Sequence, residues 1–529
     1  MGILRNILCR VRPISTGDAR MMSSLSIDRM GTGRNQVSAF AALVLAGLLA
    51  GCTTGPDFER PAAPEVNGYI AAPLPERTAS AATAVGAAQH FIAGSSVSAQ
   101  WWRELGSPKL DALIEQALQA SPNVVSARAT LRQARETYAA QAGATLYPQI
   151  DASIAPQRQR LNPSALGQAG DAREFSLYNA SVGVRYQLDL AGGNRRALEA
   201  LAARAEYRRY ELDGARLTLA ANIVNTAVSQ AKFAAQIQAT QAILRAQDEQ
   251  LQLTRERLRL GQAAPDDVLA LQTQVEQTRA GLPLLRKQHQ QSEHLLAVLA
   301  GRPPGAEGLP TFTLTEFTLP TDLPLLVPSE LVRRRPDTQA AEALMHAANA
   351  EYGVAVSKMY PQVVISASLG SQALSTGALF GSGTAVWSLI GQLTQPIFNP
   401  GLPAEKRAAL ATFDAAAANY ENVVLESLRN VADVLRALDD DAQTLAALAA
   451  ADAAAQESEE SMRRQYALGA ASYVEVLTAQ QQAQQTRITL IAAQAQRLAD
   501  SSALYQAMGG TSVGAMPGGR GGTEEPQRR

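Results

Sequence analysis

The residue whose setting most clearly predicts a chemical modification is Cys52. It follows Leu49-Ala50-Gly51, and an apolar run over 37–50 precedes it, with Arg29 and Arg34 upstream. A charged start, a short apolar run and small residues at its end are the parts of an export signal. A cysteine directly after such a signal is the acylation position of lipoprotein signals, so we expect a covalent lipid on Cys52. The alternative is an ordinary export signal followed by an incidental cysteine.

The same segment bears on the start of the chain and on membrane spans. Met21, Met22 or Met30 is the expected initiator, which would remove Cys9. Since Cys9 and Cys52 are the only cysteines, neither a disulfide framework nor a cysteine-rich metal site is available. The run before Cys52 is short for a membrane-spanning helix, and no other stretch reaches eighteen uninterrupted apolar residues.

Other candidate chemistry is weaker. His289, Glu293 and His294 resemble a zinc helix only superficially, because the five-residue step places the two imidazoles about 140° apart and no third ligand is evident. The run 333–335 of three arginines is interpreted as a solvated or salt-bridged turn, and Gly192-Gly193 lacks the spacing of a phosphate loop. We therefore predict neither catalysis nor a metal site. With 47 basic against 48 acidic residues, we also predict no nucleic-acid partner.

An internal repeat underlies the rest of the chain. Tyr147-Pro148-Gln149 recurs as Tyr360-Pro361-Gln362, and Leu260-Gly261 recurs as Leu468-Gly469. Motifs that recur in the same order at an offset of about 210 residues predict one structural unit that occurs twice. This period is too long for a solenoid repeat.

Each unit is predicted to hold a helix, two strands and a long helical hairpin. Apolar and polar residues alternate at Ile150, Ala152 and Ile154 and again at Val363, Ile365, Ala367 and Leu369, which predicts strands with one apolar face. Proline-free runs then predict helices of roughly 100 Å, at about 1.5 Å per residue. The expected helices cover 123 to about 145, 194–260, 338 to about 359 and 404–468, with return helices from Pro265 and Ser472.

The hairpin turns carry helix-start signals. Ser472 and Glu475 have the spacing of a capping box, and Pro265 fits the first helical position with Asp266 and Asp267 following. Each turn also contains a glycine, Gly261 or Gly469.

Four amphipathic strands pose a physical problem that an oligomer would solve. Four strands cannot close a barrel, and an open sheet edge in hydrocarbon leaves backbone groups unpaired. Three copies would supply twelve strands, an even number within the usual range. The alternative, a soluble β-sandwich beside a coiled coil, explains strands and helices separately but not their repetition in one lipid-tethered chain.

Several motifs in order carry a family resemblance. The chain resembles the TolC-like outer membrane factors from Cys52 to Gly510, specifically the NodT-type lipoprotein branch of tripartite (RND-type) efflux systems. The matching motifs are Gly55-Pro56-Asp57-Phe58-Glu59-Arg60-Pro61, Trp101-Trp102-Arg103-Glu104-Leu105, Pro108-Lys109-Leu110, Leu188-Asp189-Leu190, Pro328-Ser329-Glu330-Leu331-Val332-Arg333-Arg334-Arg335-Pro336-Asp337 with Ala341-Glu342, and Pro396-Ile397-Phe398.

This resemblance implies a mixed α and β fold. It implies a homotrimer with a twelve-stranded outer-membrane β-barrel and a periplasmic α-helical barrel, docked to a periplasmic adaptor and an inner-membrane pump. It also places a gate at the hairpin tips, with Asp266, Asp267, Tyr466 and Glu475 near the constriction and Gly261, Gly469 and Ser472 at the adaptor-docking turns. Ala471 stands where a basic gate residue occurs in some members, and Thr478 where an acid is common.

The expected function is a passive outer-membrane exit duct for small toxic compounds or drugs. A type I protein-secretion duct and a non-pore periplasmic lipoprotein are the alternatives. The expected organisation is a signal region (1–51), a lipid-anchored tether (52–100), a first repeat (101–310), a linker (311–337), a second repeat (338–510) and a disordered tail (511–529).

Overall fold

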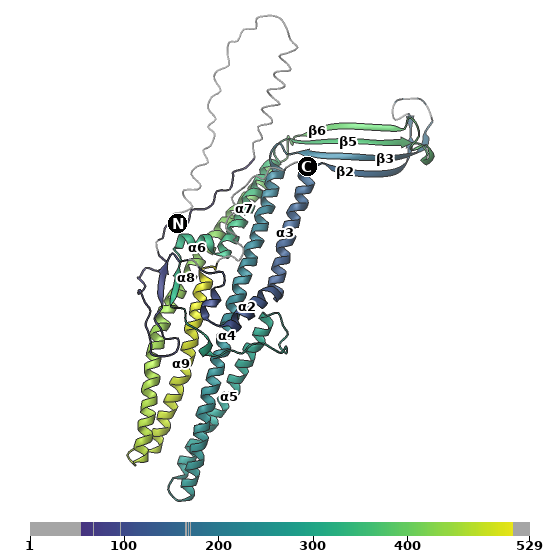
Figure 1. Ribbon diagram of the computed structural model, residues 1–529. Helices are drawn as coiled ribbons and strands as arrows, with labels where there is room; N and C mark the ends of the chain where they lie inside the picture. The colour runs from purple at the N-terminus through teal and green to yellow at the C-terminus, as the bar shows by residue number, and fades with distance from the viewer. Residues whose placement is uncertain are drawn as a thin grey trace, which may run out of the picture. The chain divides into compact units, whose positions relative to one another are not determined.

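The computed structural model describes residues 54–510 except 67, 96, 164–166, 168 and 170 (Figure 1). The expected export signal, Cys52 and the tail 511–529 therefore lie outside the described residues. One order of elements, a helix, two strands, a long helix and a return helix, occurs twice. The first set is α3 (Pro122–Leu146), β2 (Gln149–Leu161), β3 (Arg173–Leu188), α4 (Gly193–Arg259) and α5 (Pro265–Leu299); the second is α7 (Pro336–Ser357), β5 (Gln362–Ala373), β6 (Ala385–Thr394), α8 (Gly401–Ala467) and α9 (Tyr473–Ala507).

The helices confirm the predicted ranges to within three residues at each compared end. Both long helices, α4 and α8, have 67 residues, and both return helices, α5 and α9, have 35. α4 packs against α3, α5, α7 and α9. Its buried face is rich in alanine, including Ala221, Ala227 and Ala231, which are fully buried and let neighbouring helices approach closely. No helix of the described part is long and apolar enough to cross a membrane.

The main hydrophobic core lies between the hairpins and elements that the sequence reasoning did not predict. These are a 3₁₀ turn η2 (Trp101–Leu105), α2 (Pro108–Ala120), the two-stranded parallel sheet of β1 (His90–Ala93) and β4 (Asp322–Leu325), and α6 (Pro328–Arg334). Trp101 is 1 % exposed, and its ring stacks on Tyr505 with centroids 5.5 Å apart. Aromatic packing of this kind fastens the segment before α2 to the end of α9.

The four predicted strands form one antiparallel sheet in the order β2-β3-β5-β6. The register places Ala152 opposite Val182, Val182 opposite Leu369, and Leu369 opposite Trp387. Residues directly opposite share a face, so these side chains form one apolar row across the sheet. Leu369 and Trp387 are 67 % and 78 % exposed in the single chain, which leaves this face without a covering layer from the described residues.

The other face of the sheet is mostly polar. Ser153 lies 3.1 Å from Ser181 through their hydroxyl oxygens, and Ser368 lies 2.8 Å from Ser388 in the same way. The alternation of apolar and polar residues predicted at 150–154 and 363–369 is therefore confirmed.

The described residues of the segment 54–89, expected as part of an extended tether, form no helix but are packed on the body of the chain. The Tyr69 hydroxyl donates to the Leu326 carbonyl at 2.6 Å. Gln89 is fully buried, and its side-chain amide donates to Pro320 and to the Ser501 hydroxyl.

Candidate functional site

The turn between α4 and α5 closes through a glycine and a carboxylate cap. Gly261 has φ of 76°, the left-handed region that glycine reaches at little cost, and its N–H donates to the Leu258 carbonyl at 2.9 Å. The Ala264 N–H donates to Oδ2 of Asp267 at 3.1 Å. Because alanine has no side-chain acceptor, this is only half of a capping box. Asp266 is exposed in the same first turn of α5.

The turn between α8 and α9 carries the complete capping box that the sequence predicts. Gly469 also has φ of 76°, and its N–H donates to the Tyr466 carbonyl at 3.0 Å. The Ser472 N–H donates to Oε2 of Glu475 at 2.6 Å, and the Glu475 N–H donates to the Ser472 hydroxyl at 3.3 Å. The backbone and hydroxyl hydrogen bonds of Ser472 lower the pKa of Glu475, so this carboxylate stays charged.

The two hairpins meet close to these turns. Tyr473 is buried with Leu251 of α4 and Val268 of α5 in one cluster. The rings of Tyr466 and Tyr473 lie 5.4 Å apart, and the guanidinium carbon of Arg257 lies 5.9 Å from the Tyr466 ring centroid. The half-buried Tyr466 thus belongs to the contact between the hairpins.

The tips carry more positive charge than the sequence reasoning recognised. Arg257 and Arg259 end α4, where cations offset the negative end of the helix dipole. Arg259 pairs with Glu256, and this hydrogen bond lowers the pKa of Glu256. The carboxylates of Asp266, Asp267 and Glu475 therefore lie at the same end of the hairpins as the cationic side chains of α4. The arginine-rich last turn of α4 is a readable signal that the sequence analysis did not use.

A polar seam separates α4 from α8 and α9 above the tips. A cavity of about 320 Å³ lies there, with Gln247, Gln480 and Arg487 in its wall. Gln247 is 3 % exposed, yet neither of its side-chain amide atoms has a hydrogen-bond partner among the described residues. The buried Asp452 accepts from Gln456 at 2.7 Å and pairs with Arg487 at 3.4 Å. Unsatisfied buried groups disfavour this packing, so the seam is a weak contact between the hairpins.

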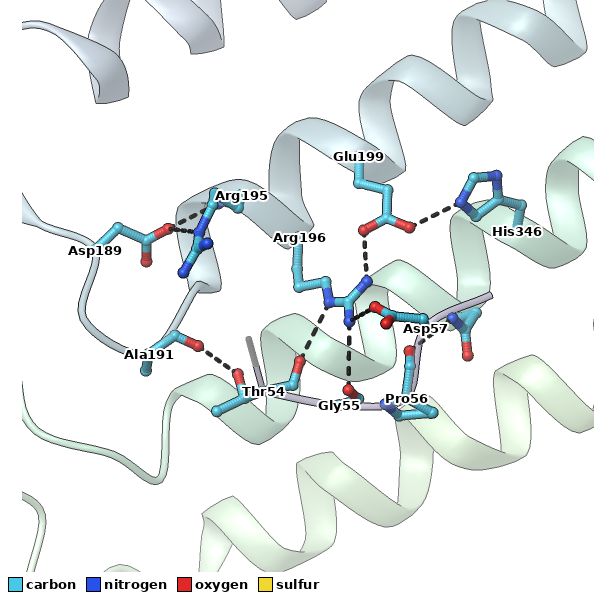
Figure 2. Close-up of polar contacts among 11 residues, drawn as sticks. Thr54, Gly55, Pro56, Asp57, Asp189, Ala191, Arg195, Arg196, Glu199 and His346 are labelled. Atoms are coloured by element: carbon cyan, nitrogen blue, oxygen red, sulfur yellow. Dashed lines mark hydrogen bonds and ion pairs between the residues drawn. The ribbon is translucent and has the colours of Figure 1, made fainter. Parts of the chain in front are cut away.

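A second candidate site holds the chain immediately after Cys52. Figure 2 shows Arg196, near the start of α4, pointing at the backbone of this segment. Its guanidinium donates to the carbonyls of Thr54 and Gly55 at 3.2 and 3.3 Å and to Oδ1 of Asp57 at 2.6 Å. Thr54 in turn donates twice to the Ala191 carbonyl, at 3.2 Å from its N–H and 2.6 Å from its hydroxyl.

Glu199 and His346 complete this network. Burial alone would raise the pKa of Glu199, but hydrogen bonds from His346 at 2.8 Å and Arg196 at 2.7 Å outweigh it, so the pKa is lowered. The Phe58 ring stacks on His346 with centroids 4.4 Å apart. A Cβ on Gly353 would lie 2.9 Å from Cγ of Arg196, so this position in α7 leaves room only for glycine. Arg196, Glu199, His346 and Gly353 are thus residues that the sequence reasoning missed.

Two motif segments have local structural roles. Asp189, after β3, accepts from the Asn194 and Arg195 N–H groups at 3.0 and 2.9 Å and so caps the start of α4. Arg335 donates to the Ala507 carbonyl at 2.8 Å and pairs with Asp337 at 2.7 Å, which confirms a salt-bridged turn before Pro336.

Comparisons with known proteins agree with this architecture. The family model for outer membrane efflux proteins matches residues 113–302 and 327–510. The toluene efflux pump outer membrane protein TtgC of Pseudomonas putida is 30 % identical over 484 residues, covering 89 % of this chain and 95 % of that protein. The pyoverdine export outer membrane protein OpmQ of Pseudomonas aeruginosa is 30 % identical over 420 residues, covering 78 % and 87 %. The solved outer-membrane channel OprN is similar with a TM-score of 0.77 at 26 % identity, covering 87 % of this chain and 99 % of that chain.

The family match spans both sets of elements described above, from α2 to the end of α9. The family resemblance predicted from the motifs is thereby confirmed. The chain belongs to the outer membrane efflux protein family.

Proposed function

We propose that this outer membrane efflux protein is one of three identical subunits of an outer-membrane channel that serves a tripartite efflux pump. The observation that carries the proposal is the sheet. Within the described residues its edge strands β2 and β6 each pair with one neighbour, and its apolar face is uncovered. Closing twelve strands from three copies would pair every edge and turn the apolar face to lipid.

The helical hairpins support the other half of this proposal. α4 with α5 and α8 with α9 leave the same end of the sheet, and three copies would continue the barrel as an α-helical tube into the periplasm. The two sets of elements in this subunit would descend from one duplicated unit, since both have the same element order and helix lengths. A periplasmic adaptor would dock at the tips, around Gly261, Gly469 and Ser472. An inner-membrane pump would supply the energy, so the duct itself catalyses no reaction.

The cargo proposed is small toxic compounds or drugs, in a broad sense. Two relatives at the same 30 % identity are named for toluene efflux and for pyoverdine export. This difference in cargo at equal similarity favours a duct that leaves selection to its pump. Deleting the gene should sensitise cells to small toxic molecules without reducing protein secretion. The reverse result would support a type I protein-secretion duct.

Channel formation is tested by reconstitution. Purified full-length trimers should conduct ions in planar bilayers under gate-opening conditions. A water-soluble monomer that never conducts would contradict the pore and support a structural lipoprotein.

We place the gate at the tips, with Asp266, Asp267, Tyr466 and Glu475. In a trimer each acid occurs three times, and such a ring favours cations. Replacing Asp267 and Glu475 together with Ala should lower cation preference. Glu405→Gln, at the opposite end of α8, is the matched control. Equal ion selectivity in the double variant and in the unmodified channel would remove both acids from the gate.

The lipid anchor is a separate proposal. Cys52 ends the expected export signal and precedes Thr54, which is hydrogen-bonded to Ala191, by two residues in the sequence. Radiolabelled palmitate should enter the unmodified protein but not Cys52→Ser. Labelling of both proteins would place the lipid elsewhere.

A further inference from the structure

Two arginines share the apolar face of the sheet. Arg158 and Arg160 lie four and six residues after Ile154 on β2, even separations that place all three side chains on one face. Across the β2–β3 pair they oppose Ser176 and Glu174. Cations on the apolar face of such a sheet require a specific environment, because charge in hydrocarbon is costly.

The register places these arginines beyond the apolar band. On β3 the band runs from Leu188 to Tyr178, eleven residues whose ten steps of about 3.3 Å span about 33 Å along the strand. With the usual tilt of 35–45°, this span is about 25 Å high, the height of the apolar belt of outer-membrane barrels. Arg158 and Arg160 lie one and two steps further, towards the β2–β3 connection and away from the helices. They therefore fall at the level of the lipid headgroups in the leaflet opposite the periplasm.

Their charge is only partly neutralised. Glu174 lies 3.2 Å from Arg158 and 3.9 Å from Arg160, so one carboxylate is shared between two guanidinium groups. The arginine side chains remain 76 % and 69 % exposed. Arg173 belongs to the same strand end, but it pairs with Leu161 and faces the polar side. The excess positive charge of the apolar face thus lies at one edge of the sheet, the strand ends next to the β2–β3 connection.

We propose that Arg158 and Arg160 bind the phosphate groups of anionic lipids in the outer leaflet. Guanidinium groups bind phosphate oxygens in pairs, and the register places both arginines just past Tyr178, at the edge of the apolar band. Glu174 orients the two guanidinium groups and leaves donors free for a ligand. This proposal rests on the proposed function, because it requires the apolar face to meet lipid.

The test uses the full-length trimer purified in detergent and diphosphoryl lipid A as the probe. Native mass spectrometry counts the lipid A molecules retained per trimer. The Arg158→Gln/Arg160→Gln variant should need about fivefold or more extra lipid A for equal retention, since each arginine near an anionic surface contributes about that factor. Arg158→Lys/Arg160→Lys, which keeps both charges but not the paired donors, should retain less lipid A than the unmodified trimer and more than the double Gln variant. Arg173→Gln, which removes one charge from the opposite face at the same strand ends, should retain lipid A like the unmodified trimer.

The outcomes separate this inference from the proposed function. Equal retention by the double Gln variant, or an equal loss in Arg173→Gln, overturns the lipid site. Equal retention of phosphatidylcholine and lipid A by the unmodified trimer overturns it as well. Trp387 on the apolar face reports independently on membrane insertion. Brominated phosphatidylcholine vesicles should quench a fluorescence component that Trp387→Phe removes, and failure of that quenching would contradict the proposed function itself.

Discussion

Nη2 of Arg196 lies 2.6 Å from Oδ1 of Asp57, although 139 positions separate the two residues in the chain. The contact is asymmetric, because the Arg196 side chain is 5 % exposed and that of Asp57 is 86 % exposed. The stabilising part of the network is therefore the buried guanidinium with the Thr54 and Gly55 carbonyls and Glu199. The exposed Asp57 contributes little.

Removing the guanidinium should release the segment that follows Cys52. Arg196→Gln leaves Glu199 and two carbonyls short of a buried partner, a loss of roughly 3–5 kcal/mol. Chymotrypsin should then cut after Phe58 at least about ten times faster, since about 1.4 kcal/mol corresponds to each factor of ten. Asp57→Asn is the control and should change the rate little. Equal cleavage of all three proteins would contradict the role given to Arg196.

Gly353 provides an independent test of the same packing. Gly353→Ala places a Cβ 2.9 and 3.1 Å from Cγ and Cδ of Arg196 and should lower the free energy of unfolding by about 1–3 kcal/mol. Gly214→Ala in α4 is the matched control, because its nearest atom, Cβ of Pro336, is 3.8 Å away. It should raise stability by about 0.5–1 kcal/mol. Thermal unfolding measures both, and a stabilised Gly353→Ala would refute the close approach.

The two tip turns differ in one removable hydroxyl. Ser472→Ala abolishes half of the α9 capping box and should lower stability at that turn by about 1 kcal/mol. Ala264→Ser should complete the box with Asp267 and slow amide exchange at the start of α5. Hydrogen exchange of the tip amides reports both changes. Unchanged exchange in Ala264→Ser would mean that the α5 start cannot use the hydroxyl.

The buried carboxyl group of Asp500, next to Asp441, predicts a pH dependence. Burial first, and then the hydrogen bond and charge of Asp441, raise the pKa of Asp500 to about 7, against roughly 3.9 in an unfolded chain. Between these values the folded chain holds a proton that the unfolded chain has released, so stability falls as pH rises from about 4 to about 7. Asp500→Asn should flatten this profile and raise the melting temperature at pH 8. Parallel profiles from pH 5 to 8 for the two proteins would show that Asp500 does not carry the dependence.

The sequence predicted the elements whose signals are local. Alternating residues identified the strands, proline-free runs identified α4 and α8, and the Ser472–Glu475 spacing identified a cap, because each signal needs only neighbouring residues. α2 was missed although Ser107 and Pro108 mark its start, because the surrounding motif was used only for the resemblance.

The Arg196 site could not be predicted in the same way. Its partners come from the segment at 54–57 and from α7, so it depends on contacts across more than 130 residues. Gly353 carries no signal until the side chain of Arg196 is known to cross its surface. The Gly55-Pro56-Asp57 motif marked one side of this contact without indicating the other.

The matched helix lengths restrict how such a protein can change size in evolution. α4 and α8 have equal lengths, as do α5 and α9, and the contact of Tyr466 in α8 with Arg257 in α4 requires both turns to stay level. Inserting seven residues into one helix would shift its turn by about 10 Å and move its side chains out of register with those of the other hairpin. A relative with longer or shorter hairpins therefore requires matched insertions or deletions in all four helices. Selection should remove an insertion or deletion in one helix alone.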